Sequence, residues 1–284
     1  MRLCRVANTV FSAPPLSWLF RPPRLWDRRD PLRSFEENLR GGLGCLEGLL
    51  MISDVAGKAV LDVGCGMGDR TVVLALAGAA GATGLDLDPE KLLWARSLQR
   101  SLGSGSAQFV LGSASALPFP DRSFHLVLLL DVIEHVQDPL AALQETQRVL
   151  LPGGKALINF PPYRSPWGAH LFEHVPIPWA HLICPGRQLL ELWREIHARK
   201  VARGEVLTSA ARTRCIMEAD SVADLWSLNE MTIKRFMELL SVASLEVVAV
   251  RLHTPGGLGT PLTRVHPIRE YVVTRVSAVV RPQC

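Results

Sequence analysis

Short, nearly uninterrupted apolar runs alternate with longer stretches of mixed polarity from residue 58 onward. The apolar runs predict strands, and the mixed stretches between them predict helices. Continuous apolar strands are typical of a parallel sheet that helices cover on both faces. The pattern therefore predicts an α/β fold with a doubly wound, mostly parallel seven-stranded sheet. The predicted strands span residues 59–63, 83–87, 108–111, 124–130, 155–160, 245–252 and 271–280, and the predicted helices span residues 35–53, 69–77, 89–102, 139–150, 187–199 and 229–240.

The alternation stops between residues 161 and 228, after the fifth predicted strand, in a segment with six prolines and four tryptophans. We interpret this segment as a lid or acceptor insertion over the carboxyl edge of the sheet, where ligands of this architecture bind. The tryptophans form either the core of the lid, which we favour, or an apolar pocket wall. The predicted organisation is a basic extension at residues 1–34 and a single domain at residues 35–284 that contains the insertion.

The composition excludes two broad classes of protein. With 48% hydrophobic and 20% charged residues, the chain is neither disordered nor collagen-like. It contains no apolar run of the ~18–20 residues that a membrane-spanning helix needs. The formal net charge of +4 lies mainly in the extension and the insertion, so it says little about the chemistry of the sheet.

The extension and the cysteines bear on the cellular compartment. Residues 1–26 contain arginines and no acidic residue, a composition typical of a mitochondrial transit peptide. We favour the alternative that this segment is a bacterial N-terminal arm lying on the domain. The six cysteines form no C-x-x-C pair, which indicates a reducing compartment. We therefore expect a cytoplasmic protein, with the mitochondrial matrix as the alternative.

A glycine-rich turn follows the first predicted strand. Gly64, Gly66 and Gly68 alternate with other residues, and Asp62 lies two positions before the first of them. Glycine permits positive φ and a close approach of a ligand to the backbone. A dinucleotide fingerprint would need its third glycine at Asp69. The spacing therefore favours a ligand that has no pyrophosphate, and it disfavours a nicotinamide oxidoreductase.

An acidic residue ends the second predicted strand at Asp86, eighteen residues after Gly68. A carboxylate in this place can accept hydrogen bonds from two ribose hydroxyls. The alternative is that Asp86 caps the next helix, but Asp88 is better placed as its N-cap because it directly precedes Pro89.

Five segments in this order resemble the motifs of S-adenosylmethionine-dependent methyltransferases with a Rossmann-like fold, the class I small-molecule type. The five segments are residues 60–68, 84–88, 117–127, 131–136 and 148–154. The resemblance is close over about residues 55–160 and loose over the last strands. It implies S-adenosyl-L-methionine as cofactor and methyl transfer as activity.

The resemblance also implies a set of cofactor-binding residues. The glycines would shape the pocket for the methionine part, Asp62 would orient the amino group, and Asp86 would hold the ribose. Asp131 would face the methionine part, unless it caps the turn at residues 132–136. Many relatives have an acid at the adenine contact where this chain has a serine, and Leu87 and Ala114 would flank the ring. The implied residues are Asp62, Gly64, Cys65, Gly66, Gly68, Asp86, Leu87, Ser113, Ala114 and Asp131.

A catalytic base is optional, since alignment of acceptor, methyl group and sulfur supplies much of the acceleration. The candidate bases are His135, Tyr163, His170 and His174, with His181 as a further candidate. The spacing of His170, Glu173 and His174 matches a zinc-peptidase signature, but that motif needs a helix and prolines bracket this segment. We therefore expect no metal site.

The sequence thus predicts a methyltransferase that acts on a small organic acceptor at oxygen, nitrogen or carbon, by in-line displacement. If the tryptophans form a pocket wall, the acceptor is aromatic or lipid-like. Nucleic acid is not expected, because the basic segment at residues 197–214 lacks interleaved aromatic residues. The alternatives are a non-catalytic cofactor-binding module that acts through partners, and a methyltransferase that acts on protein or RNA. The oligomeric state stays open.

Overall fold

The computed structural model describes residues 46–172, 174–204, 216–255 and 260–283, which form two compact units. The sheet unit contains the described residues of 46–160, 234–251 and 276–283. The insertion unit contains the described residues of 161–233 and 252–275. The predicted extension at residues 1–34 lies outside the described residues.

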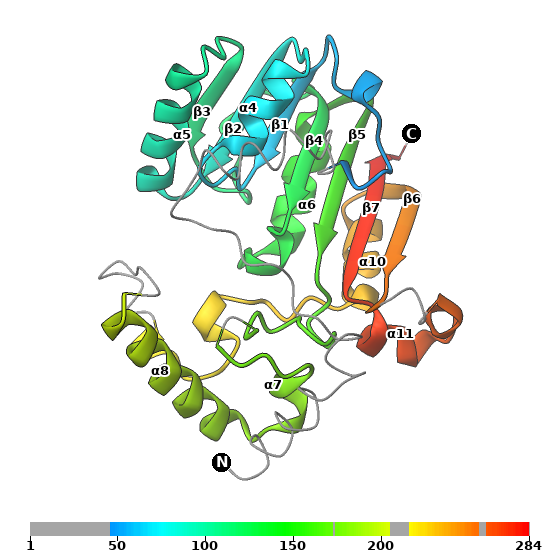
Figure 1. The fold of residues 1–284 in the computed structure, drawn as a ribbon. Coiled ribbons are helices and arrows are strands. Elements are labelled where there is room, and N and C mark those ends of the chain that lie inside the picture. The colour runs from blue at the N-terminus through cyan, green and yellow to red at the C-terminus, as the bar shows by residue number, and fades with distance from the viewer. Residues whose placement is uncertain (1–45, 173, 205–215, 256–259, 284) are drawn as a thin grey trace. The chain divides into compact units, whose positions relative to one another are not determined.

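A seven-stranded sheet with the strand order β3-β2-β1-β4-β5-β7-β6 forms the centre of the fold (Figure 1). β1 to β5 are parallel, and β7 runs antiparallel to β5. The order reverses between β1 and β4, which is the switch point of a doubly wound sheet. The predicted fold class is therefore confirmed. The strands are β1 (Ala59–Val63), β2 (Gly81–Asp86), β3 (Ala107–Leu111), β4 (Phe124–Leu130), β5 (Leu150–Phe160), β6 (Leu245–His253) and β7 (Arg275–Pro282).

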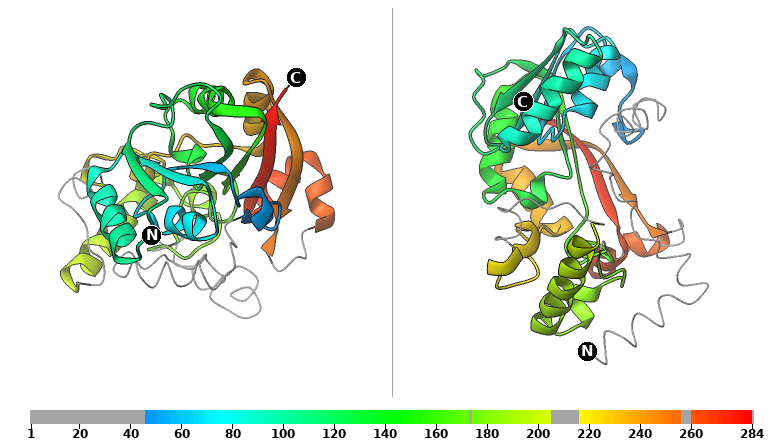
Figure 2. Two further views of the ribbon diagram at one scale, coloured as in Figure 1. Left: turned by 90° about the horizontal axis from the view of Figure 1, so that it is seen from above. Right: turned by 60° about the vertical axis from the view of Figure 1, so that its left-hand side comes forward.

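Helices cover both faces of the sheet, as the continuous apolar strands predicted. Helices α4 (Asp69–Leu76) and α5 (Pro89–Ser101) lie on one face. Helices α6 (Pro139–Val149) and α10 (Ile233–Val242) lie on the other (Figure 2). The Phe236 ring of α10 meets the Phe160 ring of β5, with centroids 4.9 Å apart. Burial of these apolar layers is the main stabilising contribution.

Two predicted elements near the ends of the described chain differ from the structure in their extent. Residues 35–45 of the helix predicted at residues 35–53 lie outside the described residues, and its remainder is not an α-helix, because turns and a short 3-10 helix, η2 (Ile52–Asp54), occupy this part of the chain. Glu47 and Gly48 take φ angles of 56° and 61° there, which an α-helix does not allow. The strand predicted at residues 271–280 begins only at residue 275, because α11 (His266–Val272), with a proline in its first turn, occupies the preceding residues.

The insertion unit has a hydrophobic core of its own. Its helices are α7 (Ala180–Ile183), α8 (Gly186–Ala202) and α11, with the 3-10 helices η4 (Asp224–Trp226) and η6 (Thr260–Arg264). Trp193 of α8 is 1% exposed within this core, and Trp167 is buried too. These two tryptophans therefore belong to the interior rather than to an open pocket wall. Among the described residues, no helix is both long and apolar enough to cross a membrane.

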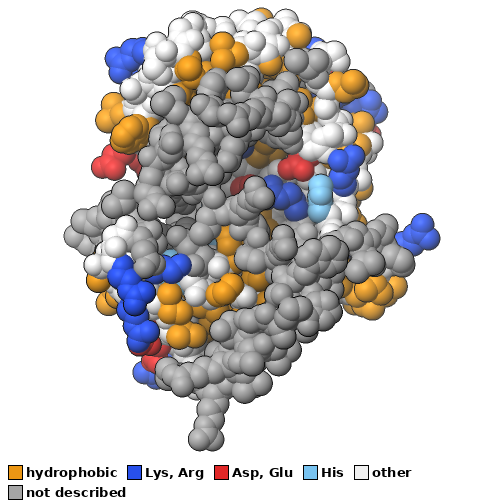
Figure 3. Space-filling view, in the orientation of Figure 1, with side chains coloured by type: hydrophobic (Ala, Val, Ile, Leu, Met, Phe, Trp, Pro, Cys, Tyr) orange, Lys and Arg blue, Asp and Glu red, His pale blue; other side chains and the backbone are white. Residues whose placement is uncertain are grey.

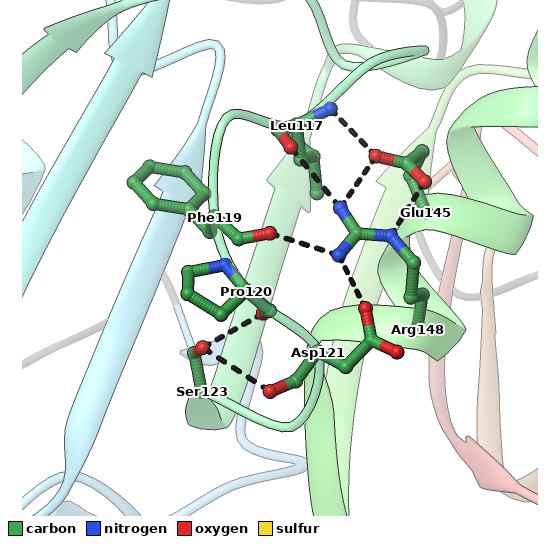
Figure 4. A network of polar contacts seen from close by, with 7 residues as sticks. All are labelled: Leu117, Phe119, Pro120, Asp121, Ser123, Glu145 and Arg148. Atoms are coloured by element: carbon green, nitrogen blue, oxygen red, sulfur yellow. Dashed lines mark hydrogen bonds and ion pairs between the residues drawn. The ribbon is translucent and has the colours of Figure 1, made fainter.

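Arg148, in the last turn of α6, holds the loop that connects β3 to β4 (Figure 4). Its Nη1 donates to the Phe119 carbonyl and to Asp121 Oδ1, both at 2.8 Å, and its Nη2 donates to the Leu117 carbonyl at 3.0 Å. Glu145 accepts from the Arg148 guanidinium and from the Leu117 N–H. These bonds lower the pKa of the Glu145 carboxyl, which favours its charged form and therefore the ion pair with Arg148.

We expect Arg148→Ala to lower the free energy of unfolding by about 2–4 kcal/mol, because it removes several charge-assisted hydrogen bonds at once. Urea unfolding of the purified variant measures this loss. Lys234→Ala serves as the control: Lys234 forms an exposed pair with Glu238 on α10, and such pairs contribute at most about 0.5 kcal/mol. Equal effects of the two substitutions would show that Arg148 does not hold the loop.

Candidate functional site

Polar side chains stand where the parallel strands of the sheet unit end. Asp62 lies near the end of β1, Asp86 ends β2, Asp131 follows β4, and Asn159 lies near the end of β5. Since the carboxyl ends of parallel strands share one edge, the structure brings these four side chains to the same edge of the sheet. The sequence predicted the three aspartates but not Asn159.

The three glycines of the turn after β1 differ in what surrounds them. All three have positive φ, at 67° for Gly64, 58° for Gly66 and 80° for Gly68. A Cβ on Gly64 would lie 2.5 Å from the Val132 side chain, and a Cβ on Gly68 would lie 2.6 Å from the Phe109 ring. A Cβ on Gly66 would meet no heavy atom within 4 Å. Packing therefore requires glycine at positions 64 and 68, whereas the space beside the Gly66 Cα is not filled by other protein atoms.

Asp86 joins the glycine turn to the end of β2. Its Oδ2 accepts from the Gly66 N–H at 2.8 Å, and its Oδ1 accepts from the Asp88 N–H at 2.9 Å. Each carboxylate oxygen has a second lone pair, so Asp86 can accept two further hydrogen bonds. The cap of α5 is Asp88, which accepts from the N–H groups of Glu90 and Lys91. The prediction that Asp88, rather than Asp86, caps α5 is therefore confirmed. The ribose contact of Asp86 stays a prediction.

Asp62 is 1% exposed, and each of its carboxylate oxygens has a partner within the sheet unit. Its Oδ1 accepts from Arg70 Nε at 2.9 Å, and its Oδ2 accepts from Thr71 Oγ1 at 2.7 Å. Both partners lie on α4, so this contact fixes the helix against β1. The pattern of the sequence did not reveal either partner. Direct contact between Asp62 and a ligand stays a prediction.

The residues predicted to contact an adenine ring differ in exposure. Leu87 is 70% exposed just beyond β2, and Ala114 is buried. Ser113 Oγ accepts from the Ser115 N–H at 3.2 Å. Cys65 is a buried free cysteine, and burial raises the pKa of its thiol, which therefore stays protonated.

Asp131 takes a left-handed backbone conformation, with φ at 56°. Its N–H donates to Asn159 Oδ1 at 2.8 Å, and Asn159 Nδ2 donates to Glu47 Oε1 at 2.7 Å. The N-cap of the following 3-10 helix, η3 (Ile133–His135), is Val132 rather than Asp131. A lone asparagine in an apolar strand is the only sequence signal for this chain of contacts.

Two candidate bases of the insertion unit, Tyr163 and His181, are poor proton acceptors. Burial, with the neighbouring Glu230, raises the pKa of Tyr163 to about 12. Burial also lowers the pKa of His181 to about 4. His181 Nε2 lies 2.6 Å from the Tyr163 carbonyl oxygen, and since a carbonyl only accepts, this nitrogen carries the proton.

His174 lies in the core of the insertion unit. Its ring stacks on Trp193, with centroids 4.3 Å apart, and its Nε2 lies 3.0 Å from His197 Nδ1. Burial, with the nearby Lys200 and His197, lowers the pKa of His174 to about 3. Glu173 of the zinc-like spacing lies outside the described residues. The described residues beside it form turns rather than the helix that the zinc motif needs.

The remaining two candidate bases lie in different units. His135 ends η3 in the sheet unit. His170 lies in the insertion unit and takes a left-handed conformation, with φ at 54°. Both side chains are half-buried.

Gly68→Ala should destabilise the protein more than Gly66→Ala. The added methyl group at Gly68 would overlap the Phe109 ring, which we expect to cost about 3 kcal/mol or more. At Gly66 only the left-handed backbone opposes alanine, at about 1–2 kcal/mol. Urea unfolding of both variants tests this order, and a larger loss for Gly66→Ala would contradict it.

The insertion unit should lose stability as the pH falls from about 6.5 to about 4. Its buried His181 and His174 stay neutral when folded, because their pKa values are about 4 and about 3. In the unfolded chain both take up protons near pH ~6.5, so acid favours unfolding. His181→Gln keeps a donor for the Tyr163 carbonyl and does not titrate. Its urea midpoint should therefore fall less than that of the wild type between about pH 7.5 and about pH 5; equal falls would exclude His181 as a cause.

Comparison with known proteins points to one family. Residues 61–158 match the family described as "Methyltransferase domain". The chain is 36% identical over 102 residues to norajmaline N-methyltransferase from Rauvolfia serpentina, a match that covers 36% of this chain and 35% of that protein. It is 31% identical over 138 residues to 2-methyl-6-phytyl-1,4-hydroquinone methyltransferase from Synechocystis sp., covering 48% of this chain and 40% of that protein. The matches thus span less than half the length of these curated relatives.

A solved structure shows the same fold over most of the chain. An S-adenosylmethionine-dependent methyltransferase from Mesorhizobium loti superposes with a TM-score of 0.52 and 17% identity, over 85% of this chain and 97% of that one. The family match runs from β1 to β5, the strands whose carboxyl ends carry the polar groups described above. Residues 61–158 of this chain are therefore similar to the family described as "Methyltransferase domain", and the chain shares the fold of this solved structure.

Proposed function

We propose that this protein transfers the methyl group of S-adenosyl-L-methionine to a small organic acceptor, at an oxygen, nitrogen or carbon atom. The observation that carries the proposal is the contact between Asp86 and the Gly66 N–H at 2.8 Å. This contact places a carboxylate that can accept further hydrogen bonds beside Gly66. A Cβ on Gly66 would meet no heavy atom within 4 Å, so a ligand has room to approach the backbone there. That arrangement suits a ligand that presents a ribose and lies against the backbone of the turn.

The residues at the edge of the sheet fit the parts of this cofactor. Asp86 would accept from the ribose hydroxyls, and the backbone at Gly66 would lie along the methionine part. The exposed Leu87 and the small Ala114 would flank the adenine, and the exposed Asp131 would face the methionine part. When bound, S-adenosyl-L-methionine supplies a methyl group on a positively charged sulfur, which an aligned acceptor displaces in line.

His135 is our candidate for a general base. Tyr163 holds its proton at neutral pH, and His174 and His181 are too weakly basic to take one up. His135 belongs to the same compact unit as the cofactor-binding motifs, at the end of η3. A base is needed only where the acceptor carries a proton that must leave.

The proposed acceptor is a small, aromatic or lipid-like molecule. One relative is named for a hydroquinone that carries a phytyl chain, which is an aromatic ring with a lipid tail. Within each unit, the described Lys and Arg side chains visible in Figure 3 form small groups, whereas nucleic-acid binding favours a long basic stripe. An acceptor on protein or RNA is the alternative.

The proposed compartment is the cytoplasm, with the mitochondrial matrix as the alternative. Cys65 is a buried free cysteine, as expected in a reducing environment.

Titration calorimetry with S-adenosylhomocysteine tests the proposal directly. We expect the wild-type protein to bind it, and we expect Asp86→Ala to weaken binding more than tenfold, since a charged acceptor contributes about 1.5–3 kcal/mol per hydrogen bond. Glu238→Gln on the exposed face of α10 is the matched control, expected to bind as the wild type does. Absence of binding by the folded wild-type protein would refute the proposal.

A second measurement separates an enzyme from a non-catalytic cofactor-binding module. Incubating the protein with isotope-labelled S-adenosyl-L-methionine and a metabolite extract should yield a labelled small molecule, which mass spectrometry identifies. Label on protein or RNA alone would favour the macromolecular acceptor. Cofactor binding without any labelled product would favour the non-catalytic module.

A further inference from the structure

We propose that Asn159 is a positioning residue for the amino-acid end of the cofactor. It holds Asp131 in its left-handed conformation and connects it to Glu47, in the segment before β1. This inference rests on the proposed function, because Asp131 is a carboxylate that we assign to the methionine part of the cofactor.

Asn159 holds the left-handed backbone of Asp131 through two contacts. The Asp131 φ of 56° is a conformation that non-glycine residues seldom adopt without help from the surrounding structure. The Asp131 N–H donates both to the Asn159 carbonyl at 3.2 Å and to Asn159 Oδ1 at 2.8 Å. Asn159 therefore supplies both acceptors for this N–H, and the exposed carboxylate of Asp131 follows from that backbone geometry.

The Asn159 amide can act in this way only in one orientation. The side chain is 2% exposed, so both of its ends need partners. Its Nδ2 donates to Glu47 Oε1 at 2.7 Å, a charge-assisted bond. Because an amide donates at one end and accepts at the other, the Glu47 carboxylate fixes which end faces Asp131.

The backbone of Glu47 is bound by Arg251, which lies on an edge strand of the sheet. The Glu47 carbonyl oxygen accepts from Arg251 Nη1 at 2.5 Å, and the Gly48 carbonyl accepts from Arg251 Nη2 at 3.4 Å. Arg251 lies on β6, the last strand of the sheet. A chain of contacts thus runs from Arg251 through Glu47 and Asn159 to Asp131, and all four residues belong to the sheet unit.

The test compares two ligands that differ only at the end in question. S-adenosylhomocysteine and 5′-methylthioadenosine share the adenosine and the sulfur, but only the first carries an amino acid group. In titration calorimetry, we expect Asn159→Ala to weaken the binding of S-adenosylhomocysteine about tenfold. It should leave the binding of 5′-methylthioadenosine within about twofold of the wild type.

Each outcome separates this inference from the proposed function. Equal losses of affinity for both ligands would show general damage to the site. No loss of affinity for either ligand would show that Asn159 is not needed. Either result overturns this inference and leaves the proposed function standing. If the folded wild-type protein binds neither ligand, the proposed function fails and the inference fails with it.

A rescue experiment distinguishes positioning from a merely structural role. Asn159→Asp still offers an acceptor to the Asp131 N–H, but it places a second carboxylate next to that of Glu47, and the two repel each other. We therefore expect a loss of S-adenosylhomocysteine affinity similar to that of Asn159→Ala. Glu47→Gln in the same chain restores a donor opposite the new carboxylate. The double variant should return to within about threefold of the wild type, and failure to recover affinity would overturn the link through Glu47.

Discussion

A sheet built from continuous apolar runs can carry polar groups only where its strands end, and every polar group buried there must find a partner. This constraint organises the carboxyl edge of the sheet unit. Asp62 is nearly inaccessible and Asp86 is only 8% exposed, yet each has partners at both oxygens. The groups that would bind a ligand are therefore also the groups that hold the edge together.

The three aspartates are engaged to different degrees, and the difference suggests what each can do. Asp62 uses both oxygens on a helix, so its contribution is to orient α4 and the turn before it. Asp86 accepts one backbone N–H at each oxygen and retains capacity for two more bonds. Asp131 is exposed, and its N–H is held by Asn159. Exposure of the three aspartates thus increases from β1 through β2 to the residue that follows β4.

The sequence predicted what depends on neighbouring residues along the chain. The apolar runs gave β1 and β4 with their observed bounds, and the position of Asp88 before Pro89 gave the cap of α5. Contacts between distant segments left no such signal. Glu47 and Asn159 are far apart in sequence, and neither belongs to a recognisable motif. The left-handed turn at residues 47–48 likewise depends on Arg251, on another strand.

The insertion unit shows why the acceptor is harder to derive than the cofactor. In the proposed function, cofactor binding would depend on backbone geometry and on a few carboxylates that also hold the sheet edge together. Acceptor choice would depend on the insertion unit, which has a hydrophobic core of its own. Within this unit, Trp193 lies in the hydrophobic core and the His174 ring stacks on it. Burial lowers the pKa values of His174 and His181, so neither is an effective base near neutral pH. Since methyl transfer relies more on alignment than on proton transfer, such a segment can change its acceptor while the sheet edge stays the same. Function here is therefore set by the site on the fold and not by the fold itself.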